Sequence, residues 1–196
     1  MRKAEMTRKT AETDIACSLC LEGTGKANIQ SGVGFMDHML TLVAVHSGFD
    51  LALSCTGDTW VDDHHSVEDI GIVLGSCLKE ALGEKRGIRR YGSQYLPMDE
   101  ALILCTLDLS GRSSLTQNVS FQTEKIGSFD TELIREFFLG LVRSCPMSLH
   151  FHEIAGENSH HLAEAMFKGF ARALAEAVRV DERHGDRIPS SKGTLS

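Results

Sequence analysis

The chain has 196 residues, of which 42% are hydrophobic and 24% are charged, and its formal net charge is -7. This composition is that of an ordinary globular protein, and it excludes a largely disordered or fibrous chain. The negative charge and the lack of a basic arm argue against nucleic acid as a partner. The sequence contains no apolar run long enough to cross a membrane and no signal-peptide pattern, so we expect a cytoplasmic protein without a membrane partner.

Alternating and helical patterns predict the same series of elements in each half of the chain. In the first half we expect strands over 2–10, 13–21 and 27–30, a helix over 35–47, a strand over 50–55 and a helix that Asp62 or Asp63 caps and that runs to Leu82. In the second half we expect strands over 91–96, 101–109 and 113–121, a helix over 131–144, a strand over 147–154 and a final helix. Each half therefore predicts a four-stranded sheet with two helices on one face, which is an α+β fold.

One motif occurs in both halves, as Asp63-His64-His65-Ser66-Val67-Glu68 and as Ser159-His160-His161-Leu162-Ala163-Glu164. Each copy opens an apolar run at helical spacing. On a helix the glutamate lies beside either histidine, and adjacent histidines point about 100° apart, so one unit serves two metal ions more easily than one. The repeat indicates a duplication with halves at 1–90 and 91–182, followed by a tail at 183–196 that is either disordered or a binding arm.

Imidazole and carboxylate groups without thiolates favour Mn, Fe, Co, Ni or Zn in an open site. The duplication adds a further pair, because Asp37-His38 aligns with Arg135-Glu136. The candidate metal ligands are His38, His64, His65, Glu68, Glu136, His160, His161 and Glu164. The alternative is a pair of solvated helix N-termini, where acidic residues favour the helix dipole. His150 and His152 share one face of a strand and are either substrate-facing or satisfied polar histidines.

Basic residues form the second group. Lys168 lies four residues after Glu164, on the ligand face of the predicted helix. Arg90, Arg112 and Lys192, with Ser190 and Ser191 just before Lys192, occupy loop or tail positions of the kind that hold a phosphate by charge-assisted hydrogen bonds. Taken singly, a basic residue at such a position is more often just a solvated charge. The basic run from 85 to 90 joins the two halves and is equally consistent with a solvated linker.

These motifs together resemble the imidazoleglycerol-phosphate dehydratase family over nearly the whole chain. The matching segments are Gly32 to Leu40, Asp63 to Asp69, Lys85 to Arg90, Pro97 to Glu100, Leu109 to Arg112, Gly156 to Lys168 and Pro189 to Gly193. The resemblance implies a hydro-lyase of histidine biosynthesis that dehydrates D-erythro-imidazoleglycerol phosphate to imidazoleacetol phosphate with two Mn²⁺ per active site. It also implies ribosomal-S5-like halves, trimers that assemble into a 24-subunit shell, and active sites shared between subunits. Many members have histidine where this chain has Glu136.

The chemistry explains the residue types. Metal ions on both ring nitrogens would hold the substrate ring as an imidazolate, whose electrons can expel the adjacent hydroxyl. The resemblance places Glu12 near the reacting carbons, and Glu68 or Glu164 could combine the roles of ligand and base. The expected catalytic residues are Glu12, Glu68 and Glu164, and the expected substrate-binding residues are Glu12, His38, His64, His65, Arg90, Arg112, His160, Lys168, Ser190, Ser191 and Lys192.

Two alternatives use the same ligand types. A dinuclear metal-dependent phosphate-ester hydrolase would release inorganic phosphate but would need a bridging hydroxide. A non-catalytic, metal-assembled shell would keep the histidine pairs and have no use for Lys168, Arg112 or the tail.

Overall fold

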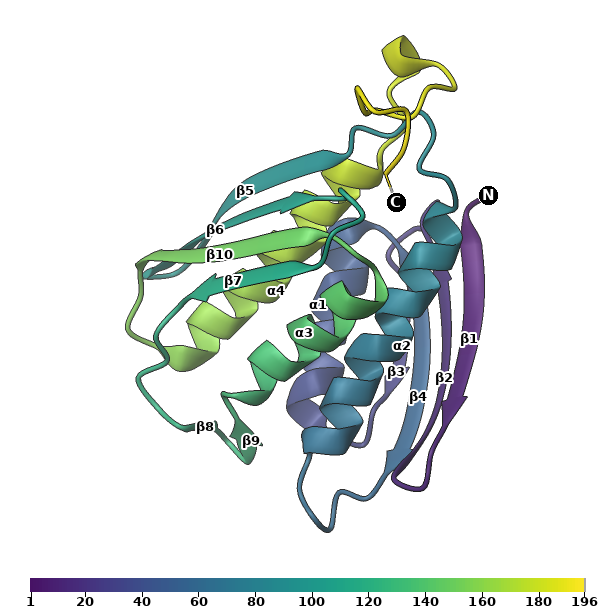
Figure 1. Ribbon diagram of the computed structural model, residues 1–196. Helices are drawn as coiled ribbons and strands as arrows, with labels where there is room; N and C mark the ends of the chain where they lie inside the picture. Colours follow the sequence, from purple (N-terminus) through teal and green to yellow (C-terminus); the bar gives the residue numbers. More distant parts are fainter. Residues whose placement is uncertain (196) are drawn as a thin grey trace.

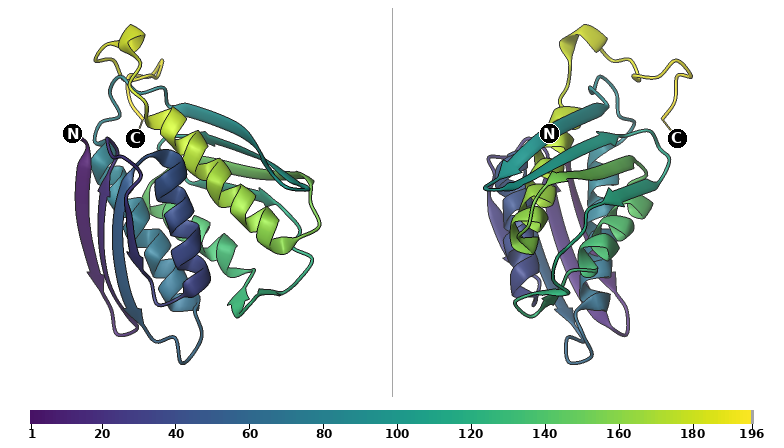
Figure 2. Two further views of the ribbon diagram at one scale, coloured as in Figure 1. Left: turned by 180° about the vertical axis from the view of Figure 1, so that it is seen from behind. Right: turned by 90° about the vertical axis from the view of Figure 1, so that its left-hand side faces the viewer.

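The computed structural model describes residues 1–195, so the last residue of the predicted tail, Ser196, lies outside the described residues. Two four-stranded sheets form the outer layers, and four helices lie between them (Figures 1 and 2). Within the described residues, no helix is both long and apolar enough to cross a membrane. The α+β class predicted from the sequence is confirmed.

The first sheet has the order β1-β2-β4-β3. Its strands are β1 (Lys3–Lys9), β2 (Thr13–Cys20), β3 (Ala27–Gln30) and β4 (Asp50–Gly57), and all pair antiparallel except β3 with β4, which is parallel. Helices α1 (Gly34–Ser47) and α2 (His64–Leu82) cover its inner face. In β2 the buried side chains Ile15, Cys17 and Leu19 alternate with more exposed ones, as expected for a sheet with one buried face.

The second sheet repeats this plan in the order β5-β6-β10-β7. Its strands are β5 (Tyr91–Met98), β6 (Ala101–Asp108), β7 (Ser114–Asn118) and β10 (Ser148–Ala155), and its helices are α3 (Leu133–Ser144) and α4 (Ser159–Val178). As in the first sheet, the third and fourth strands in sequence, here β7 and β10, pair in parallel, and the other described pairings are antiparallel.

The structure differs from the sequence prediction between β7 and α3. The strand predicted over 113–121 covers only 114–118, and a small hairpin of β8 (Lys125–Ile126) and β9 (Phe129–Asp130) follows it. Gly127, at φ 62°, makes the tight turn of this hairpin. In the tail, a 3₁₀ turn covers Glu182–His184.

Contacts between the helices join the two halves. Helix α2 packs on α3, and α1 packs on α4. Glycines allow α2 and α3 to approach closely: a Cβ on Gly71 would lie 2.3 Å from the carbonyl oxygen of Phe137, and one on Gly75 would lie 2.6 Å from that of Leu141. One hydrophobic core therefore spans both sheets and all four helices.

Candidate metal centre

A cluster of three predicted ligands forms where α1 meets α4. His38 Nε2 lies 2.9 Å from Glu164 Oε1, and His160 Nε2 lies 3.0 Å from the same oxygen. The three ligand atoms all lie within 4.8 Å of one another. Within one chain, the packing of the two halves thus brings His38 of the first half together with His160 and Glu164 of the second half.

Glu164 is the buried member of the cluster, with 7% of its surface exposed. Burial raises the pKa of its carboxyl, but hydrogen bonds from Lys168, His38 and His160 outweigh burial and lower the pKa to about 2. Lys168 forms an ion pair with Glu164 from one turn along α4, as the i,i+4 spacing predicts. The carboxylate is therefore ionised at neutral pH, which is the form that binds metals.

The first turn of α4 is fixed by Asn158. Its side-chain oxygen accepts hydrogen bonds from the backbone N–H groups of His160, at 2.8 Å, and His161, at 3.3 Å. In α2 the corresponding bond comes from Asp62, whose carboxylate accepts the N–H of His64 at 2.8 Å, while Asp63 makes no side-chain capping bond. Both histidine pairs therefore lie at capped helix N-termini.

The second histidine of each pair bonds a carboxylate through Nδ1. His65 Nδ1 donates to Asp58 at 3.0 Å, and His161 Nδ1 donates to Glu100 at 2.6 Å. These hydrogen bonds raise the pKa of both histidines. They also leave each Nε2 atom directed away from its partner, which is the arrangement by which carboxylates orient metal-binding histidines.

Sequence reasoning did not assign Asp58 or Glu100 to the site. Asp58 follows Gly57 in a turn, and Glu100 follows Asp99 between two strands, so both read as ordinary turn residues. For Glu100 the available signal was its place in the matching segment Pro97 to Glu100, whereas Asp58 offered no signal beyond the turn that precedes the first histidine pair.

The remaining predicted ligands are less closely associated. His64 Nε2 lies 3.9 Å from Glu68 Oε2. Glu12, in the turn between β1 and β2, has its Oε1 atom 3.8 Å from His65 Nε2. Glu136 lies in the first turn of α3, and among residues 1–195 it makes no hydrogen bond or ion pair with another predicted ligand. Its role as a ligand stays a prediction.

The basic residues predicted to hold phosphate lie at the other end of the helices, apart from Lys168. Helix α4 has 20 residues, which corresponds to about 30 Å, and the cluster lies at its start, whereas the tail follows its end (Figure 1). Arg90 donates two hydrogen bonds to Asp108, at 2.7 and 3.0 Å, and one to the Pro189 carbonyl at 3.0 Å. Arg112 is exposed. A single chain therefore does not bring the phosphate-type groups to its own cluster.

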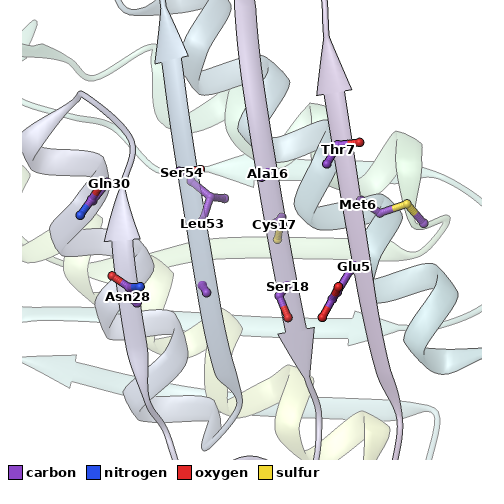
Figure 3. Close-up of a pocket in the computed structure, with 11 residues that line it drawn as sticks. Glu5, Met6, Thr7, Ala16, Cys17, Ser18, Asn28, Gln30, Leu53 and Ser54 are labelled. Atoms are coloured by element: carbon purple, nitrogen blue, oxygen red, sulfur yellow. The ribbon is translucent and has the colours of Figure 1, made fainter.

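The outer face of the first sheet carries a shallow pocket of about 450 Å³ (Figure 3). Short side chains such as Ala16, Ser18 and Ser54 line it, and Glu5 is its only carboxylate. It contains no histidine and no basic residue, so it is a poor match for either a metal or a phosphate and does not belong to the candidate centre.

The fold and the cluster define a class: an α+β protein of two similar sheet-and-helix halves, whose helices bring together imidazole and carboxylate groups that could hold a metal ion. A family model described as imidazoleglycerol-phosphate dehydratase matches residues 31–174. Proteins of that name from Cereibacter sphaeroides (strain KD131 / KCTC 12085) and Jannaschia sp. (strain CCS1) are 58% and 55% identical over 195 residues, covering 100% of both chains in each case.

Two solved structures agree. The imidazoleglycerol-phosphate dehydratase of Staphylococcus aureus subsp. aureus N315 is 41% identical with a TM-score of 0.83, covering 91% of this chain and 99% of its own. The structure from Pyrococcus furiosus in complex with (S)-C348 is 37% identical with a TM-score of 0.84, covering 97% and 100%. The chain belongs to the imidazoleglycerol-phosphate dehydratase family, a family of hydro-lyases, and the resemblance identified from the sequence is confirmed.

Proposed function

We propose that this protein dehydrates D-erythro-imidazoleglycerol phosphate to imidazoleacetol phosphate, a step of histidine biosynthesis, in the cytoplasm. Membership of the family supports the reaction. The observation that carries the proposal is the cluster of His38, His160 and Glu164, whose three ligand atoms all lie within 4.8 Å of one another.

The donor set fits a divalent metal such as Mn²⁺. Two imidazole nitrogens and one carboxylate oxygen already face one another, and no thiolate is present to select a closed zinc site. We propose two Mn²⁺ ions per active site, held by the eight predicted ligands His38, His64, His65, Glu68, Glu136, His160, His161 and Glu164. Bound ions would act as Lewis acids on the nitrogens of the substrate ring and stabilise its deprotonated form.

Other side chains would orient the metal ligand, transfer a proton and bind the phosphate. Lys168 keeps Glu164 ionised and in place through their ion pair. Glu12 is exposed and lies beside His65, so it is available to move a proton between the substrate carbon and the leaving hydroxyl. Arg90, Arg112, Ser190, Ser191 and Lys192 would bind the phosphate, whose binding energy positions the ring.

The geometry of the single chain supports self-association. Within one chain the histidine cluster lies at the start of α4, whereas the tail with Ser190, Ser191 and Lys192 follows the end of that helix, which supports a site completed by residues of a second copy. We propose that trimers assemble into a 24-subunit shell through the shared metals, and that the repeats at 1–90 and 91–182, with the tail at 183–196, form one compact unit in each subunit.

The test measures assembly and turnover together. The protein is stripped of metal with a chelator, Mn²⁺ is restored, and particle mass and imidazoleacetol phosphate formation are followed in parallel. A joint rise supports the proposal. A rise in mass without turnover would favour a non-catalytic shell, and Mn²⁺-dependent release of inorganic phosphate would favour a hydrolase.

A further inference from the structure

Lys85 is a buried cation in the linker between the two halves. It is 8% exposed, and its backbone adopts the left-handed conformation, at φ 58°, which residues other than glycine rarely occupy. Its ammonium donates to the carbonyl oxygens of Leu109, at 3.2 Å, and Leu195, at 3.3 Å. No carboxylate of residues 1–195 forms an ion pair with it. An ammonium that is buried with only carbonyl oxygens as partners, on a residue with a strained backbone, costs folding free energy. A specific role for Lys85 would explain why this arrangement is kept.

The two acceptors belong to the segments that carry the phosphate-type groups. Leu109 opens the sequence Leu109-Ser110-Gly111-Arg112, in which the Arg112 N–H bonds Ser110 Oγ at 3.3 Å. Leu195 lies three residues beyond Lys192. One ammonium therefore ties the loop of Arg112 to the tail of Lys192.

The rest of the linker contacts the same tail. Arg86 donates to the Asp186 carbonyl at 3.2 Å, and the Gly87 N–H donates to the Arg187 carbonyl at 2.9 Å. A Cβ on Gly87 would lie 2.6 Å from the carbonyl oxygen of Gly185, so only glycine allows the tail this close. The linker is not simply a solvated charge run, the alternative that its composition allowed.

A hollow of about 400 Å³ beside Lys85 supplies a matched control. Lys79 and Lys85 both line it, together with Thr194 and Leu195 of the tail. Lys79 is exposed, whereas Lys85 is buried and makes both carbonyl bonds. Removing either ammonium changes the local charge equally, but only the removal of Lys85 takes away a hydrogen bond to the tail.

We propose that Lys85 is a positioning residue for phosphate recognition, which holds the Arg112 loop and the Ser190-Ser191-Lys192 segment at a fixed separation. It does not touch the substrate. The inference rests on the proposed function, because it takes these groups to be the phosphate site. Removing Lys85 should weaken phosphate binding while metal binding and binding of the imidazole ring stay intact.

The experiment compares Lys85→Met with Lys79→Met in the Mn²⁺-loaded, assembled protein. Inorganic phosphate probes the phosphate-binding part of the site, and imidazole probes the metal-binding part. Both dissociation constants are measured by calorimetry, and KM and kcat are measured for the same variants. We expect Lys85→Met to raise the phosphate Kd and the KM about tenfold, equivalent to about 1.4 kcal/mol, with kcat and the imidazole Kd within about twofold of wild type. Lys79→Met should resemble wild type, and Lys85→Arg should recover part of the phosphate affinity.

Equal phosphate affinity in the two methionine variants, or an equal loss of imidazole and phosphate binding in Lys85→Met, would overturn the inference. A wild-type protein that binds phosphate but does not dehydrate the substrate would overturn the proposed function alone. The role of Lys85 would still be tested by the phosphate Kd of the two methionine variants. If Lys85→Met does not assemble, removal of Leu195 and Ser196 takes away one acceptor without changing the cation. That truncation should also raise the phosphate Kd, and an unchanged Kd would count against Lys85.

Discussion

His38 Nε2 lies 2.9 Å from Glu164 Oε1, although the two residues belong to different halves of the chain. The contact exists because α1 packs on α4, so the same packing that closes the core also forms the cluster. Lys168 donates a hydrogen bond to the other oxygen of Glu164, so the carboxylate is held from two sides.

We therefore expect His38→Asn to lower the affinity for Mn²⁺ by at least about tenfold, because even residues that only orient ligands contribute this much. Mn²⁺ binding can be titrated by electron paramagnetic resonance of the free ion. His150→Asn is the control, since His150 stacks on His152 on the outer face of the second sheet, with ring centroids 6.2 Å apart, away from the cluster. Equal Mn²⁺ affinity in the two variants would remove His38 from the ligand set.

The separation of the cluster from the basic end predicts complementation between inactive variants. His160→Asn lacks a cluster ligand and Arg112→Ala lacks a phosphate-type group, so each alone should have little activity. If each site combines the cluster of one chain with the basic end of another, mixed reassembly should restore up to about a quarter of wild-type activity, the share of random pairings with both parts intact.

The control for this mixture is His38→Asn with His160→Asn. Both changes damage the cluster that a single chain forms, so their mixture should stay inactive. Activity in the control, or none in the test mixture, would show that the site is not divided between chains in this way.

Sequence periodicity was sufficient for the parts of the site that lie on one helix. The spacing of Glu164 and Lys168 placed both side chains on one face of α4, where the structure pairs them, because a helix brings residues four apart onto one face. Both histidine pairs were likewise placed at helix starts. The same reasoning identified the series of strands and helices along each half of the chain, since alternation and turn residues are local signals.

Contacts between distant segments were not predictable in this way. The hydrogen bond of His65 to Asp58 depends on how a turn folds back on a helix, and the burial of Lys85 depends on a tail more than a hundred residues later. The hairpin around Gly127 has strands of only two residues each, too short for an alternating pattern. Periodicity shows which face of an element is buried but not which element covers it.

The close approach of α2 and α3 predicts a marked effect for Gly140→Ala. A Cβ on Gly140 would lie 2.7 Å from the carbonyl oxygen of Glu68, so the helices must separate near a predicted ligand. Overpacking of this kind costs about 1–3 kcal/mol. Urea unfolding should show that loss, together with weaker Mn²⁺ binding. Gly34→Ala is the control, because a Cβ there meets nothing within 4 Å, and its stability should match or slightly exceed wild type. Equal stability of the two variants would contradict the packing argument.

We expect Asp50, at the start of β4, to make a pH-dependent contribution to the stability of the fold. Its carboxylate accepts the backbone N–H groups of Thr24, at 2.8 Å, and Lys26, at 3.0 Å, and these bonds lower its pKa below the usual value of 3.8. A carboxyl whose pKa is lower in the folded state stabilises the fold above pH 3.8, and this contribution is lost as the pH falls through the folded-state pKa. Asp50→Asn should therefore unfold at lower urea concentration than wild type at pH 7.

The difference between Asp50→Asn and wild type should shrink steadily below pH 3.8, as the wild-type carboxyl becomes protonated and loses its stronger, charge-assisted bonds. Both proteins are measured in chelator, so that release of metal from the histidines at low pH does not add to the signal. A difference that stays constant from pH 7 to pH 2 would assign the effect of the substitution to side-chain geometry, and the charge of Asp50 would then have no part in it.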